Sequence, residues 1–155
     1  MKKWSTPKNG FSLIEIMIVM AIIIVLGTIT SLNLFNERTR KELDVTEKSI
    51  VAVLREAQQK SITQEDESEW GVAFVDDTSD YYELTKDSTS YGKQNIIKSS
   101  LEFESVTDVS FAKITGEPSV NGDIVIIKIS GTDCLLEAEK CKTITINSNG
   151  TITYD

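Results

Sequence analysis

Hydrophobic residues follow three different patterns along the chain. Most residues from Phe11 to Phe35 are apolar, and about 20 apolar residues at about 1.5 Å of rise each can cross a bilayer core of about 30 Å. Beyond Phe35 apolar residues recur at helical spacing, and no proline interrupts the chain from Ser12 to about Ile62. After that point they alternate with polar residues, as in strands. The pattern predicts a long N-terminal helix followed by a strand-rich head.

The predicted helix has two halves. Residues 11–35 form a transmembrane half, and residues 36–62 form an amphipathic continuation whose apolar stripe faces the head. The stripe consists of Leu43, Glu47, Ile50, Leu54 and Ala57, widened by Val51 and Val53. Gly27 begins the part of the helix with the weakest intrinsic helix propensity. Either the helix extends or bends there during assembly, or these residues mark where it leaves the lipid.

Seven short segments after the helix have the composition and alternation of strands. They are Gly71–Val75, Tyr81–Thr85, Ser100–Glu104, Val109–Ile114, Asp123–Ile129, Thr143–Asn147 and Thr151–Tyr154. Asn149-Gly150 between the last two is a strong hairpin signal and puts Ile144, Ile146 and Ile152 on a buried face. Seven strands cannot all lie beside one helix. We therefore expect an α+β fold in which the long helix packs on a β-rich globular head, residues 63–155, of two small antiparallel sheets or one curled sheet.

Composition limits the chemistry that the chain can perform. The chain has 155 residues, 40% of them hydrophobic, which is enough for one domain with a core. Its formal net charge of −8 disfavours nonspecific attraction to nucleic acid. It contains no histidine, the commonest general base and metal ligand. We expect no catalytic residues, metal site or cofactor, although a membrane-tethered enzyme that uses carboxylates alone stays as an alternative.

The N-terminus combines a basic leader with an acid in an apolar run. Residues 1–10 contain three lysines, which stay in the cytoplasm by the positive-inside rule and place the head outside it. Glu15 lies within the apolar run, where a carboxylate costs about 2.5–3.5 kcal/mol near the bilayer centre. Cleavage between Gly10 and Phe11 would create an α-amino group that Glu15 could pair with, on its own chain or on a neighbour.

The sequence Lys8-Asn9-Gly10-Phe11-Ser12-Leu13-Ile14-Glu15, followed by the apolar run, closely resembles the class III signal of type IV pilins and type II secretion pseudopilins. The resemblance implies that a prepilin peptidase cuts after Gly10 and methylates the new N-terminal Phe11. Other pilin or pseudopilin subunits, and the inner or plasma membrane lipid before assembly, are then the partners. The chain would be a single-pass membrane protein with an extracytoplasmic head, and later part of a cell-surface filament or pseudopilus. An ordinary signal peptide cleaved within Gly27-Thr28-Ile29-Thr30-Ser31 is the alternative.

Softer motifs extend the resemblance into the head. Trp70-Gly71-Val72-Ala73-Phe74, Ile114-Thr115-Gly116-Glu117-Pro118 and Ile144-Thr145-Ile146-Asn147-Ser148-Asn149-Gly150 are similar to segments of H-type minor pseudopilins and FimT-like pilins. Some FimT-like pilins that serve in DNA uptake have arginines just after the final glycine. This chain has no basic residue from Gly150 to Asp155, so we expect no nucleic-acid partner.

Cys134 and Cys141 are separated by six residues. Outside the cytoplasm, two cysteines this close favour a disulfide that closes a loop before the last hairpin. Free thiols are the alternative. Zinc would need four ligands, and the chain has neither histidine nor a third cysteine to supply them.

Two further groups of residues have a functional and a structural interpretation. Asp76, Asp77 and Asp80 could offer oxygen ligands to calcium, but their spacing matches no EF-hand loop and also fits a solvated turn. The aromatic residues Trp70, Tyr81, Tyr82 and Tyr91 fit the core or a sheet edge as well as a ligand platform.

Together these features favour a structural subunit of a type IV pilus or a type II secretion-like pseudopilus. Helix packing would hold the filament together, and Glu15 would set the register of the subunits. The alternative is a pilus-associated binding or adhesion module in which Tyr81–Gly92 recognises a partner.

Overall fold

The computed structural model describes the backbone of residues 12–155 and the side chains of residues 12–27 and 37–155. The chain divides into two units, Met1–Glu37 and Arg38–Asp155. We call Arg38–Asp155 the head unit and describe each unit by itself. Helix α1 (Leu13–Ile62) contributes residues to both, and all the strands belong to the head unit.

Helix α1 contains 50 residues and ends where the sequence predicts. Within the head unit its buried side chains recur every three or four residues, which is the spacing of one helix face. They are Leu43, Glu47, Ile50, Leu54, Ala57 and Ser61, with Val51 beside them. The helix stops as Gln64 adopts a left-handed backbone conformation with φ of 55°, and the Gln64 amide donates to the Ser61 carbonyl at 3.2 Å.

The strands form two antiparallel sheets. The first contains β1 (Trp70–Val75), β2 (Tyr81–Lys86), β3 (Thr89–Ser90), β4 (Asn95–Ile96) and β6 (Val109–Phe111). Its order is β3-β2-β1-β6, and β4 also pairs with β2. The second contains β5 (Leu101–Val106), β7 (Gly122–Ile129), β8 (Cys141–Ile146) and β9 (Ile152–Tyr154), in the order β5-β7-β8-β9. Two short 3-10 helices, η1 (Glu65–Glu67) and η2 (Ala138–Lys140), lie in the connections.

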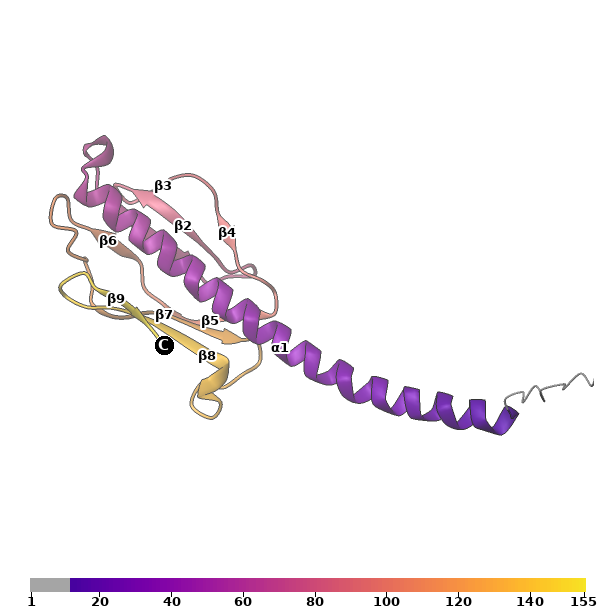
Figure 1. The fold of residues 1–155 in the computed structure, drawn as a ribbon. Helices are drawn as coiled ribbons and strands as arrows, with labels where there is room; N and C mark the ends of the chain where they lie inside the picture. The colour runs from indigo at the N-terminus through magenta and orange to yellow at the C-terminus, as the bar shows by residue number, and fades with distance from the viewer. Residues whose placement is uncertain (1–11) are drawn as a thin grey trace, which may run out of the picture. The chain divides into compact units, whose positions relative to one another are not determined.

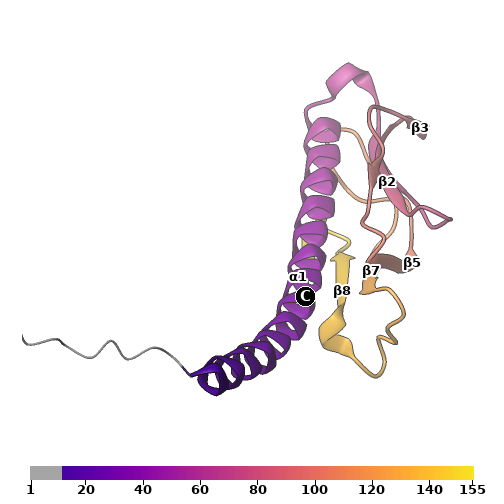
Figure 2. The same cartoon turned by 90° about the vertical axis from the view of Figure 1, so that its right-hand side faces the viewer.

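Within the head unit, the second half of α1 lies across the strands of both sheets (Figure 1). The turned view in Figure 2 shows this part of the helix on one face of the strands. The buried helix face and the inner faces of both sheets supply a single core cluster. Its largest fully buried side chains include Trp70, Phe111, Leu43, Ile50, Leu54, Ile124 and Ile127. Apolar burial of this kind stabilises by roughly 25 cal/mol per Å², so the helix stripe contributes to the stability of the head together with the sheets.

Two polar side chains at the end of α1 fix the helix to distant turns. The Gln58 amide nitrogen donates to the Gly116 carbonyl at 3.1 Å and to the Gly150 carbonyl at 2.9 Å. The hydroxyl of the buried Ser61 accepts a hydrogen bond from the Trp70 amide at 2.8 Å. A buried hydrogen bond satisfies backbone groups that would otherwise be costly to desolvate, so these contacts fix where β1 starts and where the last hairpin turns.

The prediction of the α+β class from the sequence is confirmed, as are the predicted end of α1 and the predicted last hairpin. The hairpin of β8 and β9 forms around Asn149-Gly150, with Ile146 opposite Ile152, and the isoleucines expected inside are buried. The expected strand Val109–Ile114 is shorter than predicted and ends at Phe111. It stops because the chain turns, with the Gly116 amide donating to the Ala112 carbonyl at 2.9 Å. Strands β3 and β4 have two residues each, which is too short to show alternation in the sequence.

Gly71→Ala should destabilise the head unit by about 1–3 kcal/mol, the usual cost of overpacking. A Cβ at Gly71 would lie 2.4 Å from the carbonyl oxygen of Val109 on the neighbouring strand β6, and backbone cannot yield as a flexible side chain does. The measurement is urea unfolding of the detergent-solubilised chain without residues 1–10, which removes Trp4 and leaves Trp70 as the fluorescent reporter. Gly27→Ala is the matched control, because a Cβ there meets nothing within 4 Å. Equal unfolding midpoints for Gly71→Ala and the parent protein would contradict the tight β1–β6 contact.

Candidate assembly site

The first half of α1 exposes apolar side chains on all of its faces. The large apolar residues from Leu13 to Leu26 have exposed fractions between 47% for Val19 and 77% for Leu13. They follow one another along the sequence, so they do not form a stripe that one neighbouring element could cover. A helix that is apolar all round belongs in apolar surroundings, either packed among other helices or in lipid. This segment is therefore the candidate assembly surface.

Glu15 lies in the first turn of this segment. Its backbone amide donates to the Ser12 carbonyl at 3.0 Å, and its side chain is exposed. A carboxylate in a first helical turn is favoured by the partial positive charge of the helix N-terminus. Gly10 and Phe11, the expected cleavage and methylation positions, lie outside the described residues, as does the leader.

Among the described residues, no helix meets the length and apolarity of a membrane span. The span expected from the sequence, residues 11–35, includes Phe11 and the side chains of residues 28–35, all outside the described part.

The head unit contains one buried acid that the helix stripe brings inside. The side chain of Glu47 is 2% exposed, and its Oε1 atom has no hydrogen-bond partner. Burial raises the pKa of the Glu47 carboxyl above its ordinary value of 4.5, the nearby charges of Asp44 and Asp155 add to the rise, and Lys142 and Lys48 oppose it. An unpaired buried carboxylate costs stability. The sequence places Glu47 in the stripe, but nothing in it signals that the acid lacks a partner.

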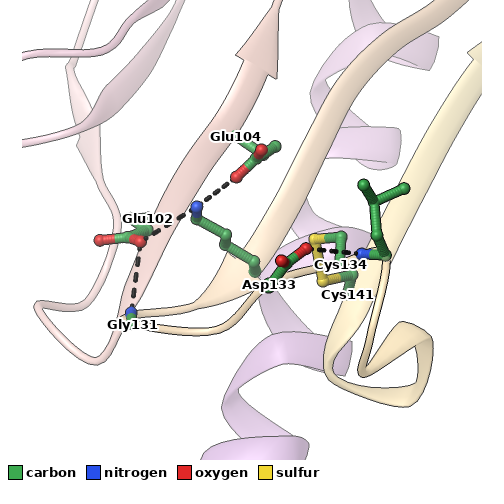
Figure 3. Close-up of a disulfide and its surroundings, with 8 residues drawn as sticks. Glu102, Glu104, Gly131, Asp133, Cys134 and Cys141 are labelled. Carbon is green, nitrogen blue, oxygen red and sulfur yellow. Dashed lines mark hydrogen bonds and ion pairs between the residues drawn. A yellow bond between two sulfur atoms is a disulfide. The ribbon is translucent and has the colours of Figure 1, made fainter.

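A disulfide closes the loop between β7 and β8. Cys134 and Cys141 are bonded, as the sequence predicts. Figure 3 shows this bond beside the turn that follows β7, where the Asp133 carboxylate accepts a hydrogen bond from the Leu135 amide at 2.9 Å. The adjacent turn is held by Glu102, which accepts from the Gly131 amide at 3.3 Å and pairs with Lys128 at 3.4 Å. The loop is therefore fixed at both of its ends.

The acidic cluster after β1 has structural contacts with backbone amides. The Asp80 carboxylate accepts from the amide of Phe103 at 2.9 Å and from that of Asp77 at 3.2 Å. Asp77 in turn accepts from the Thr78 amide at 2.7 Å. Within residues 12–155, no group of three or more acidic or cysteine side chains is arranged to hold a metal ion. Asp80 therefore acts as a link between the β1–β2 turn and strand β5.

The aromatic residues also have identifiable structural contacts. Trp70 is fully buried and Tyr82 is 4% exposed, with the Tyr82 hydroxyl 2.7 Å from the Ser49 hydroxyl on α1. Tyr91 is half-exposed and packs edge-to-face on Trp70, with ring centroids 4.8 Å apart. These contacts account for Tyr82 and Tyr91 as parts of the head and its edge.

Comparison with known protein families finds a match to the N-terminal part of the chain. The model described as the prokaryotic N-terminal methylation motif matches residues 6–31, which contain the Gly10–Phe11 junction, Glu15 and the exposed apolar segment. No curated protein and no solved structure matches the chain. The matched motif supports a type IV pilin-like protein, and a structural subunit in preference to an enzyme.

Three residues that shape the head escape prediction from the sequence. Gln58 and Ser61 act through hydrogen bonds to other segments of the chain. Glu47 matters because one of its carboxylate oxygens is buried without a hydrogen-bond partner. Two features of the sequence could have pointed to these residues. Glu47 and Ser61 are polar residues on a buried helix stripe, and the turns at Gly116 and Gly150 need a hydrogen-bond donor for their carbonyl groups.

Glu47→Gln should stabilise the head unit relative to the parent protein, and the gain should grow with pH. The folded state holds the Glu47 proton above pH 4.5, where the unfolded chain releases it, so the parent loses stability as pH rises through this range. Above the raised pKa the penalty is complete, and we expect a difference of about 1–3 kcal/mol. Urea unfolding between acidic and neutral pH measures it. Glu56→Gln, on the exposed side of the same helix, should change nothing, and parallel pH profiles for Glu47→Gln and the parent would refute the buried charge.

Replacing both Cys134 and Cys141 by serine should lower the free energy of unfolding by about 2–3 kcal/mol, because the closed loop constrains the unfolded chain. Thermal unfolding of the oxidised parent and of the double variant measures the difference. Reduction of the parent should cause the same loss of stability as the double substitution, and it should increase the mass of the protein by two hydrogens. A native protein whose mass does not change on reduction would show that the thiols are free.

Proposed function

We propose that the chain is a prepilin-type structural subunit of a type IV pilus or a type II secretion-like pseudopilus. One observation carries this proposal: the segment of α1 from Leu13 to Leu26, which lies within the matched methylation motif, is apolar on all faces and exposed in the single chain. Burial of each such side chain is worth about 1.5–3 kcal/mol. Packing of this segment among the same helices of other subunits would supply that burial in a filament.

Processing prepares the helix for assembly. A prepilin peptidase removes residues 1–10 and methylates the amino group of Phe11, which keeps its positive charge. Glu15, four residues further along, pairs with this cation on its own chain or on the neighbouring subunit. A charge buried in an apolar environment is costly until its partner is in place. The pair therefore stabilises a subunit docked in the correct register relative to a subunit that diffuses freely in the membrane.

Before assembly, residues 11–35 hold the subunit in the inner or plasma membrane. Their length fits a bilayer core of about 30 Å, and the lysines of the leader favour a cytoplasmic N-terminus. The β-rich head then lies outside the cytoplasm, where a disulfide such as Cys134–Cys141 persists. Within the superfamily, the motifs after α1 favour an H-type or FimT-like subunit.

Glu15→Ala should leave membrane insertion and cleavage intact but reduce incorporation into the filament at least about tenfold, because the cost of one unpaired charge exceeds the 1.4 kcal/mol that a factor of ten represents. The measurement is the amount of the variant that co-purifies with the other subunits from native cells, relative to the amount in the membrane.

Glu56→Ala is the matched control, since Glu56 is an exposed acid on the same helix, and it should assemble normally. Equal co-purification of Glu15→Ala and the parent protein would overturn the role of Glu15. Failure of both the parent and Glu15→Ala to co-purify with any filament subunit would overturn the proposed function itself.

A further inference from the structure

Two adjacent leucines in the disulfide loop are exposed to an unusual degree. Leu135 is 94% exposed and Leu136 is 82% exposed, more than any other large hydrophobic residue among the side chains that the structure describes. Exposed apolar residues that stand together, rather than singly, commonly mark a surface that contacts something apolar.

The loop presents these leucines in a fixed conformation. The Cys134–Cys141 disulfide closes it, and Asp133 accepts hydrogen bonds from three successive backbone amides. Its carboxylate accepts from Leu135 at 2.9 Å, and its carbonyl accepts from Leu136 at 3.1 Å and from Glu137 at 3.0 Å. An ordered loop loses little conformational entropy when it binds, so this geometry suits a contact site better than a mobile tip would.

Ion pairs place the loop at one end of the head unit. The guanidinium of Arg40 donates to the Glu139 carboxylate at 2.8 Å, and Lys142 lies 3.9 Å from Asp44. Arg40 and Asp44 stand near the start of the helix portion that belongs to the head unit. Figure 2 shows η2 and the start of β8 beside this part of α1.

Chain length fixes how far this end is from the proposed membrane span. Arg40 follows Phe35 by five residues, which is about 7.5 Å of helix. The headgroup layer on each side of a bilayer core is about 5–8 Å thick. Arg40 would therefore lie within about 7.5 Å of the outer end of the proposed span, and the disulfide loop that is ion-paired with it would be within reach of the headgroup layer.

The charges around the leucines are mixed. Arg40, Lys140 and Lys142 lie at this end of the head unit together with Asp44, Glu137 and Glu139. Positive and negative side chains nearly balance, so this region is not strongly attracted to anionic headgroups. Binding of the loop to a membrane would therefore depend on the leucines. This composition fits shallow insertion at the boundary between headgroups and acyl chains.

We infer that Leu135 and Leu136 insert shallowly into the outer surface of the membrane before the subunit is assembled. They would be a second lipid contact of the subunit, in addition to the proposed span of residues 11–35. The inference rests on the proposed function, because it needs residues 11–35 to span the bilayer. The occupant is the lipid surface itself. Every unassembled subunit has that surface within reach, whereas contact with another copy requires assembly.

The test places tryptophan at three positions in the mature chain, reconstituted in two sets of phosphatidylcholine vesicles, one with acyl chains brominated near the headgroup and one with acyl chains brominated near their ends. Leu136→Trp reports on the loop, and Ile22→Trp reports on the proposed span. Ile114→Trp is the matched control, because Ile114 is 65% exposed and its amide contacts the Ser61 carbonyl at the far end of the head's helix. The signal of the buried Trp70 is subtracted using the parent chain.

Bromine should quench Leu136→Trp at least about twofold more than Ile114→Trp, since shallow insertion reaches about 5–10 Å into the boundary layer. Bromine near the chain ends should quench Ile22→Trp, because Ile22 lies near the middle of residues 11–35. Quenching of Ile22→Trp with none at Leu136→Trp overturns this inference and leaves the proposed function standing. No quenching at Ile22→Trp overturns both. Protection of Leu136→Trp that appears only after other subunits are added assigns the leucines to a protein contact and overturns the lipid contact.

Discussion

Helix α1 carries apolar side chains along both halves, and the head covers those of only one half. From Leu43 to Ala57 the apolar stripe is buried against two sheets, while from Leu13 to Leu26 the large apolar side chains are exposed on every face. The free energy of burial is roughly proportional to the apolar area removed from water. The second group must therefore be buried by lipid or by other chains, and this requirement connects the fold to assembly.

The same helix also organises the head. Its stripe supplies part of the core, and Gln58 and Ser61 near its end fix the last hairpin and the start of β1 through hydrogen bonds to backbone groups. Glu47 interrupts the stripe with a carboxylate that is buried without a full set of partners. Such a group lowers the stability of the folded state.

Much of this architecture could be predicted because it is local. The helix end, the hairpin around Asn149-Gly150 and the pairing of two nearby cysteines each follow from neighbouring residues. The contact of Gln58 with Gly150 joins residues 92 positions apart, and the exposure of Leu135 depends on what the rest of the head leaves uncovered. No local pattern contains that information. The processing site at Gly10 and Phe11 is proposed from the sequence motif alone.

The proposed assembly depends most on an amino group that cleavage uncovers near Glu15 at the start of the apolar helix. Mass spectrometry of the N-terminus of the native protein tests this directly. The account predicts a chain that begins at Phe11 and carries a methyl group on its amino nitrogen. A chain that keeps Met1, or one that begins near Ser31, would contradict it.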